Sequence, residues 1–222
     1  RNDVQLLIKA GLIIMLIMLL VNLRSLKAVI MVFIVIIPSL FAMMGFMGWA
    51  YKITGASCFL FALLNTSMPI ILLTIANSDG VHVITKFFRE FRRLKNVETA
   101  IEYTMESLLI PIFLTSITTI AAFLTMISSP LEPLIGYGIC MSVGIAWAWI
   151  LSSLTLPAII NMVPWDSTSY SIAKPSILEN LASFFSTIVT RFPFQTFSGG
   201  VLMVFLGGIG IQNINVDVNV DN

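Results

Sequence analysis

Six long apolar runs divide this chain and restrict it to folds that lipid can surround. They cover residues 4–23, 26–50, 56–78, 107–127, 134–162 and 194–211. A helix needs about 20 apolar residues to cross the hydrocarbon core of a bilayer, and the runs are close to or above this length. Apolar residues fill whole runs rather than one stripe, which is typical of helices surrounded by lipid. The sequence therefore predicts an all-α integral membrane protein, a six-transmembrane-helix bundle.

Composition agrees with this fold class and excludes several functions. Hydrophobic residues make up 58% of the chain and charged residues 10%, well below the roughly 25% charged residues of soluble domains. The net charge of +1 does not indicate nucleic-acid binding. Cys58 and Cys140 lie in apolar runs without metal-ligand or disulfide spacing. With one His and no hydrolase or phosphate-binding motif, the sequence predicts no enzyme, no cofactor and no metal site.

The positions of the basic residues predict the orientation. Cytoplasmic loops of membrane proteins carry an excess of Lys and Arg. The loops after the first, third and fifth runs hold most of the chain's 12 basic residues, namely Arg24, Lys27, Lys86, Arg89, Arg92, Arg93, Lys95, Lys174 and Arg191. The opposite side has only Arg1, Lys9 and Lys52. We therefore expect a multi-pass protein of the plasma (inner) membrane, with both ends of this chain extracytoplasmic.

The runs and their connections suggest four parts. Residues 1–163 are expected to form a five-helix membrane core, residues 164–193 a cytoplasmic connector with an amphipathic helix, and residues 194–211 the sixth span. From Ile214 to Asp221 apolar and polar residues alternate, the period of a half-buried strand. We interpret residues 212–222 as the start of an extracytoplasmic α+β domain, and the chain as a piece of a longer polypeptide.

Two polar segments have helical amphipathic patterns. Val97, Ile101, Met105 and Leu108 share one face, opposite Glu98, Glu102 and Glu106. A second apolar stripe consists of Ile177, Leu181, Phe184, Phe185 and Ile188. Both are expected to lie at the cytoplasmic interface, where they either brace the bundle or pass movement of the spans to the cytoplasm.

Asp79, at the cytoplasmic end of the third apolar run, is the one acid that is a good candidate for a functional group within the membrane. Ionisable residues in membrane spans are costly and usually face a cavity, a partner or an ion path. His82 follows three residues later on the same helix face. One interpretation is a protonatable relay. The other is that the span ends near Ala76 and that Asp79 caps a helix over 86–94.

Two further sets of residues suggest helix contacts. Gly136, Cys140, Gly144 and Ala148 recur every four positions, which lets another helix pack closely. Thr118 and Thr119 lie in the fourth run, where hydroxyls commonly bond to carbonyls of their own helix. The alternative is that one of the two hydrogen-bonds to Asp79 across the bundle.

Several segments together resemble the resistance–nodulation–division (RND) superfamily of exporters, and most closely its lipid-exporter, MMPL-like branch. The five-helix core of this branch is similar to the sterol-sensing domain of Patched-like proteins. The resemblance runs over about residues 3–164. It rests on three segments: Ala76-Asn77-Ser78-Asp79-Gly80-Val81-His82 with Phe87-Phe88-Arg89-Glu90, then Pro111–Thr119 with Ala122-Phe123, and Ser129-Pro130-Leu131-Glu132-Pro133-Leu134 with Gly136.

The resemblance implies helices two to seven of a twelve-helix protein, with Asp79 in the proton-relay position. It implies half of an exporter of hydrophobic or lipidic substrates driven by the proton-motive force. The implied partners are the bilayer, such a substrate, the second half of the polypeptide and further copies of the protein in a homo-oligomer. A sterol- or lipid-sensing regulatory protein built on the same core is the alternative, and an accessory of protein translocation is a third.

Overall fold

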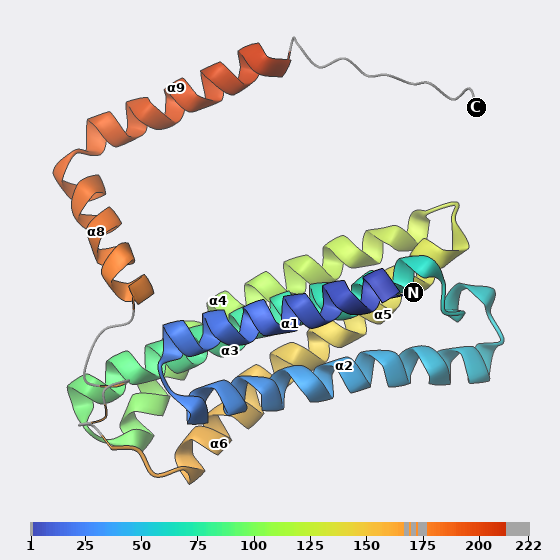
Figure 1. Ribbon diagram of the computed structural model, residues 1–222, viewed down its shortest axis with the longest axis horizontal. Coiled ribbons are helices and arrows are strands. Elements are labelled where there is room, and N and C mark those ends of the chain that lie inside the picture. The colour runs from blue at the N-terminus through green and yellow to red at the C-terminus, as the bar shows by residue number, and fades with distance from the viewer. Residues whose placement is uncertain (1, 167–168, 170–171, 173–176, 212–222) are drawn as a thin grey trace. The chain divides into compact units, whose positions relative to one another are not determined.

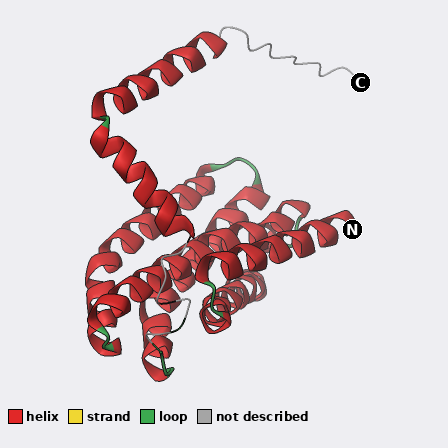
Figure 2. Ribbon diagram, turned by 60° about the vertical axis from the view of Figure 1, so that its left-hand side comes forward, coloured by secondary structure: helices red, strands yellow, loops and turns green. Residues whose placement is uncertain are grey.

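The computed structural model of the protein describes residues 2–166, 169, 172 and 177–211. They fall into two compact units, Arg1–Ser176 and Ile177–Asn222, and each unit is described by itself. Among the described residues every regular element is helical and there is no strand (Figure 2). The strand predicted over 214–221 lies outside the described residues. An all-α membrane protein is thus supported.

The first unit is a bundle of long helices that run back and forth along a common direction (Figure 1). Its elements are α1 (Asn2–Leu23), α2 (Leu26–Thr54), η1 (Ser57–Phe59), η2 (Leu63–Ser67), α3 (Met68–Leu94), α4 (Val97–Leu124), η3 (Thr125–Ser128), α5 (Glu132–Ile150), η4 (Leu151–Thr155) and α6 (Leu156–Met162). The elements η1, η2 and η3 are 3-10 turns, and η4 is a π-helical turn that continues α5 into α6.

Local signals explain where the helices begin and end. The Ser25 hydroxyl accepts a hydrogen bond from the backbone N–H of Ala28 and caps α2. The Asn96 side chain does the same for Thr99 at the start of α4, with 3.1 Å between the atoms. Gly55 and Lys95 end α2 and α3 in the left-handed region, at φ 64 and 55. The connection between α3 and α4 is consequently only Lys95 and Asn96.

The third and fourth spans differ from the sequence prediction. The span expected over 56–78 begins with two 3-10 turns, and its α-helix starts at Met68, because Pro69 has no N–H and favours the first helical turn. This helix then continues through the polar stretch to Leu94. The span expected over 107–127 and the separate surface helix expected before it form one helix, α4, since Asn96 caps at the earlier position.

Four described stretches are long and apolar enough to cross a membrane: Leu26–Thr54, Leu64–Leu94, Val97–Ser128 and Glu132–Met162. In the second unit, α8 (Ile177–Arg191) and α9 (Pro193–Ile211) form a bent pair, with 101° between Leu181–Arg191 and Pro193–Ile209. Counting that pair as one span gives five. In α1 the side chains are described from Gly11 onward, and the apolar helix Gly11–Leu23 is shorter than these four stretches. Six spans therefore remain a prediction.

The small residues of α5 lie in the interior of the bundle, and neighbouring elements approach two of them closely. Gly136, Cys140, Gly144 and Ala148 are all buried. A Cβ on Gly136 would overlap the carbonyl oxygen of Cys58, and one on Gly144 would be 2.9 Å from Leu72 Cδ2. At Gly136 a larger side chain would push α5 away from the backbone of Cys58, whereas at Gly144 the side chains of Leu72 and Met43 would have to shift.

Most basic residues of the first unit lie at one end of it, whereas Lys52 lies in the last turn of α2 at the other end. The Lys27 ammonium donates a hydrogen bond to the Pro164 carbonyl over 3.4 Å, and the Phe87 ring lies 5.4 Å from the Trp165 ring. These contacts bring together the start of α2, the last turns of α3 and the segment after α6. Contacts at the opposite end join Ser57 to Glu132, and Ser67 to Tyr137 with 3.1 Å between hydroxyl oxygens.

Candidate functional site: a cavity between α3 and α4

A cavity of about 450 Å³ lies between α3 and α4. From α3 it is lined by Thr74, Ile75, Ser78, Asp79 and His82. From α4 it is lined by Leu108, Pro111, Ile112, Thr115, Ser116 and Thr119. Apolar side chains form part of the wall, and the polar groups include one carboxyl, one imidazole and several hydroxyls.

Asp79 lies near the middle of α3 rather than at a helix end. Asp79 is 8% exposed, and α3 continues without a break on both sides of it. The alternative interpretation, that Asp79 caps a separate helix over 86–94, is therefore wrong. Among the described residues no side chain or backbone group makes a hydrogen bond or ion pair with its carboxyl group. A buried carboxyl without a partner is uncommon in protein interiors.

His82 lies one turn beyond Asp79 and lines the same cavity. Its side chain is exposed, in contrast to that of Asp79. Within the part of the chain that the structure describes, it is the only titratable residue besides Asp79 that lines the cavity. The structure therefore places the two residues of the predicted relay in one cavity, on one face of α3.

The threonines of this region use their hydroxyl hydrogens within their own helices. Thr119 Oγ1 donates to the Thr115 carbonyl over 2.6 Å and lines the cavity. Thr118 Oγ1 donates to the Leu114 carbonyl over 2.8 Å and is not among the lining residues. The structure shows the local bonds expected of such hydroxyls, and no hydrogen bond from either threonine to Asp79.

Ser116 lines the cavity, although the sequence suggested for its hydroxyl only a bond to its own helix. It is 4% exposed, and its Oγ has no hydrogen-bond partner. Its neighbours Thr115 and Thr118 share its residue type but bond to their own helix. The helical spacing of Ile112, Ser116 and Thr119 places these three on one face, and this signal could have identified it.

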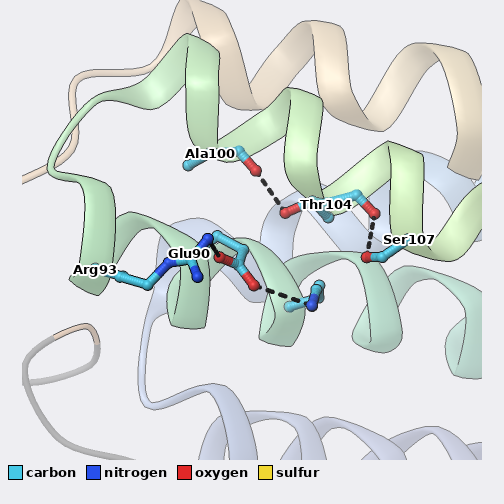
Figure 3. Close-up of polar contacts among 6 residues, drawn as sticks. Glu90, Arg93, Ala100, Thr104 and Ser107 are labelled. Atoms are coloured by element: carbon cyan, nitrogen blue, oxygen red, sulfur yellow. Dashed lines mark hydrogen bonds and ion pairs between the residues drawn. The ribbon is translucent and has the colours of Figure 1, made fainter.

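A second polar cluster lies near the basic end of α3 (Figure 3). Glu90 is 7% exposed, and its carboxylate forms ion pairs with Lys86 and Arg93. The distance is 2.9 Å both from Oε1 to Lys86 Nζ and from Oε2 to Arg93 Nη2. On α4, Thr104 donates to the Ala100 carbonyl over 2.6 Å and Ser107 to the Thr104 carbonyl over 3.0 Å. The ion pairs of Glu90 were not among the predictions, although the spacing of four residues from Lys86 and three from Arg93 is a known ion-pair signal.

No metal centre of the usual kind is present in the part that the structure describes. No group of three or more His, Cys, Asp or Glu residues there could hold a metal ion. The cysteines Cys58 and Cys140 are free thiols.

The fold and the cavity together define a polytopic helical membrane protein with a buried acid, Asp79, that lines a cavity within its bundle. The model of the MMPL family matches residues 1–193. The chain belongs to the MMPL family, which confirms the resemblance seen in the sequence. No match was found among curated proteins or among solved structures.

Proposed function

We propose that this chain is the membrane part of an RND-type exporter that moves hydrophobic or lipidic molecules and is driven by the proton gradient. The observation that carries the proposal is the Asp79 carboxyl, buried without a partner in a cavity midway along α3. Family membership supports the transporter class. In this proposal the protein lies in the plasma (inner) membrane, with its basic end toward the cytoplasm. It works together with the second half of the polypeptide or with further copies of itself.

The chemistry follows from the cost of charge in a membrane. An ionised carboxylate inside a span requires water or a counter-charge, whereas the protonated form does not. Protonation of Asp79 therefore removes the need for water in the cavity and favours closer packing of α3 on α4. Loss of the proton reverses this preference. Such a two-state change in packing is the kind of event that couples a gradient to transport.

The cavity residues have assigned roles in this cycle. Asp79 takes up and releases the proton. His82, exposed one turn toward the basic end, transfers the proton between Asp79 and that side. Thr119 offers oxygen lone pairs to cavity water, because its hydrogen is bound to the Thr115 carbonyl. Thr118 supports the helix next to the cavity rather than the relay itself.

The test is export by cells that produce the full-length protein. Asp79→Asn keeps the shape of the side chain but cannot ionise, so export should be abolished while membrane expression stays normal. Glu106→Gln is the matched control, because Glu106 is an exposed acid of α4 that does not line the cavity. Unchanged export by Asp79→Asn would refute the proton-relay proposal.

A lipid- or sterol-sensing role is the second candidate, favoured by one observation. An entirely apolar groove of about 400 Å³ runs along α2 beside Ile30, Phe33, Ile34, Ile37 and Pro38. Its lining suits an acyl chain or a sterol ring. Dissipating the proton gradient separates the two candidates, since it should stop an exporter and leave the binding of a photoreactive sterol unchanged.

A further inference from the structure

Three of the five hydroxyl groups that line the cavity, those of Thr74, Thr115 and Thr119, present oxygen lone pairs rather than hydrogens. Thr74 donates its hydrogen to the Ile70 carbonyl over 2.9 Å, Thr115 to the Ile112 carbonyl over 2.8 Å and Thr119 to the Thr115 carbonyl over 2.6 Å. Each of these Oγ1 atoms can then only accept from anything that enters the cavity. The ionised Asp79 carboxylate is likewise an acceptor only.

Ser116 supplies an independent observation at the same place. It is 4% exposed, it lines the cavity, and its Oγ has no partner. A buried hydroxyl without a partner costs about 1–3 kcal/mol, so native structures usually provide a partner. A ligand bound in the cavity that Ser116 lines would supply the missing partner.

We infer that the cavity between α3 and α4 is a binding site for a small monovalent cation such as Na⁺, held by the Asp79 carboxylate together with the oxygens of Ser116 and Thr119. Hard cations prefer carboxylate, hydroxyl and water oxygens over nitrogen and sulfur. One carboxylate and one monovalent cation leave the site neutral. A divalent cation would leave a net positive charge within the bundle, which is costly in a membrane.

The size of the cavity fits a cation that keeps part of its water. Since one water occupies about 30 Å³ of liquid, a cavity of about 450 Å³ has room for an ion and several waters. Those waters can bridge to the hydroxyls of Thr74 and Thr115, which also line the cavity. The cation and the proton then compete for one carboxylate, so that Na⁺ binding requires release of the proton from Asp79.

This inference rests on the proposed role of Asp79 as the titrating group, but its test measures ion binding rather than export. The full-length protein in detergent is treated with dicyclohexylcarbodiimide, which reacts with protonated carboxyls in apolar surroundings, and the modification of Asp79 is followed by mass spectrometry. NaCl should slow the modification in a saturable manner, whereas choline chloride at the same ionic strength should not. Parallel KCl samples measure the size preference.

Variants identify the ligands. Ser116→Ala should raise the NaCl concentration that gives half-maximal protection about tenfold. This is the effect expected when the ion loses one ligand whose contribution is similar to that of a hydrogen bond. Ser116→Thr, which restores a hydroxyl, should recover most of the protection. Thr118→Val is the matched control, because Thr118 lies outside the cavity lining, and its protection should equal that of the unchanged protein.

The outcomes separate the two proposals. Absence of protection by both Na⁺ and K⁺ in the unchanged protein overturns the cation site, even where Asp79→Asn abolishes export and the proton relay stands. Protection that Ser116→Ala leaves unaltered also overturns the assigned site. Protection by Na⁺ together with normal export by Asp79→Asn supports the cation site and refutes the proton-relay proposal.

Discussion

Gly136 on α5 lies against the backbone of Cys58, so closely that a Cβ on the glycine would overlap the Cys58 carbonyl oxygen. The contact joins the segment between α2 and α3 to the first turns of α5. It involves backbone atoms on one side, which cannot rotate out of the way as a side chain can.

Gly136→Ala should therefore destabilise the bundle. Inserting a methyl group into a tight contact typically costs about 1–3 kcal/mol, and this backbone contact leaves little room for relaxation. Thermal unfolding in detergent, followed by loss of the monodisperse peak in size-exclusion chromatography, measures the effect. Gly45→Ala is the control, because nothing lies within 4 Å of its added Cβ. Equal unfolding temperatures of the two variants would show that Gly136 is not in a tight contact.

Tyr137→Phe should weaken the contact between η2 and α5. The Tyr137 and Ser67 hydroxyl oxygens are 3.1 Å apart, and Tyr137 is 4% exposed. Loss of one such hydrogen bond costs about 0.5–1.5 kcal/mol. The same melting assay should show a small decrease, and Ser67→Ala combined with Tyr137→Phe should add little to it. Full additivity of the two changes would show that the hydroxyls do not interact.

Glu90→Gln should destabilise the basic end of α3. The change removes the negative charge that Lys86 and Arg93 share, and leaves the Lys86 ammonium, 19% exposed, without its partner. Because Arg93 is 64% exposed and therefore well solvated, we expect a modest loss of about 1–2 kcal/mol. Glu102→Gln, an exposed acid of α4, serves as the control in the melting assay.

The α8 helix should lie along the membrane surface, with its apolar side toward the lipid. Phe184 and Phe185 are each 60% exposed, and Thr187 lies on another side of the helix. Spin labels at Phe185→Cys and Thr187→Cys, in a background of Cys58→Ser and Cys140→Ala, measure this by electron paramagnetic resonance. The label at 185 should collide more with oxygen and the label at 187 more with a water-soluble nickel chelate. Equal profiles would contradict an interfacial helix.

Much of the helical architecture could be predicted from apolar runs, since their length in lipid leaves few alternatives. The start of the third span could not, because residues such as Phe59, Leu60 and Phe61 are as apolar in a turn as in a helix. Pro69 was the signal that positioned the helix start. The continuation of α3 past residue 78 to Leu94 is what places Asp79 near the middle of this helix.

The candidate site was predictable in part. A lone acid in a span stands out in any sequence, and His82 follows from helical spacing. Which hydroxyl lacks a partner does not follow from residue type. Thr118, Thr119 and Ser116 lie within four residues, yet only Ser116 has an unsatisfied oxygen. That difference depends on side-chain rotamers and on the packing of α3 against α4.

The connection between α3 and α4 consists of only Lys95 and Asn96, which gives the two helices a common pivot at the basic end. Asp79 is about 22 Å from this pivot and the far end of α3 about 39 Å, at 1.5 Å per residue. If the helices separate as rigid rods, an opening of about 1 Å at Asp79 becomes about 1.8 Å at the opposite membrane surface. In the transport cycle proposed above, a small change in helix separation at Asp79 would thus become a larger one at the far end of α3.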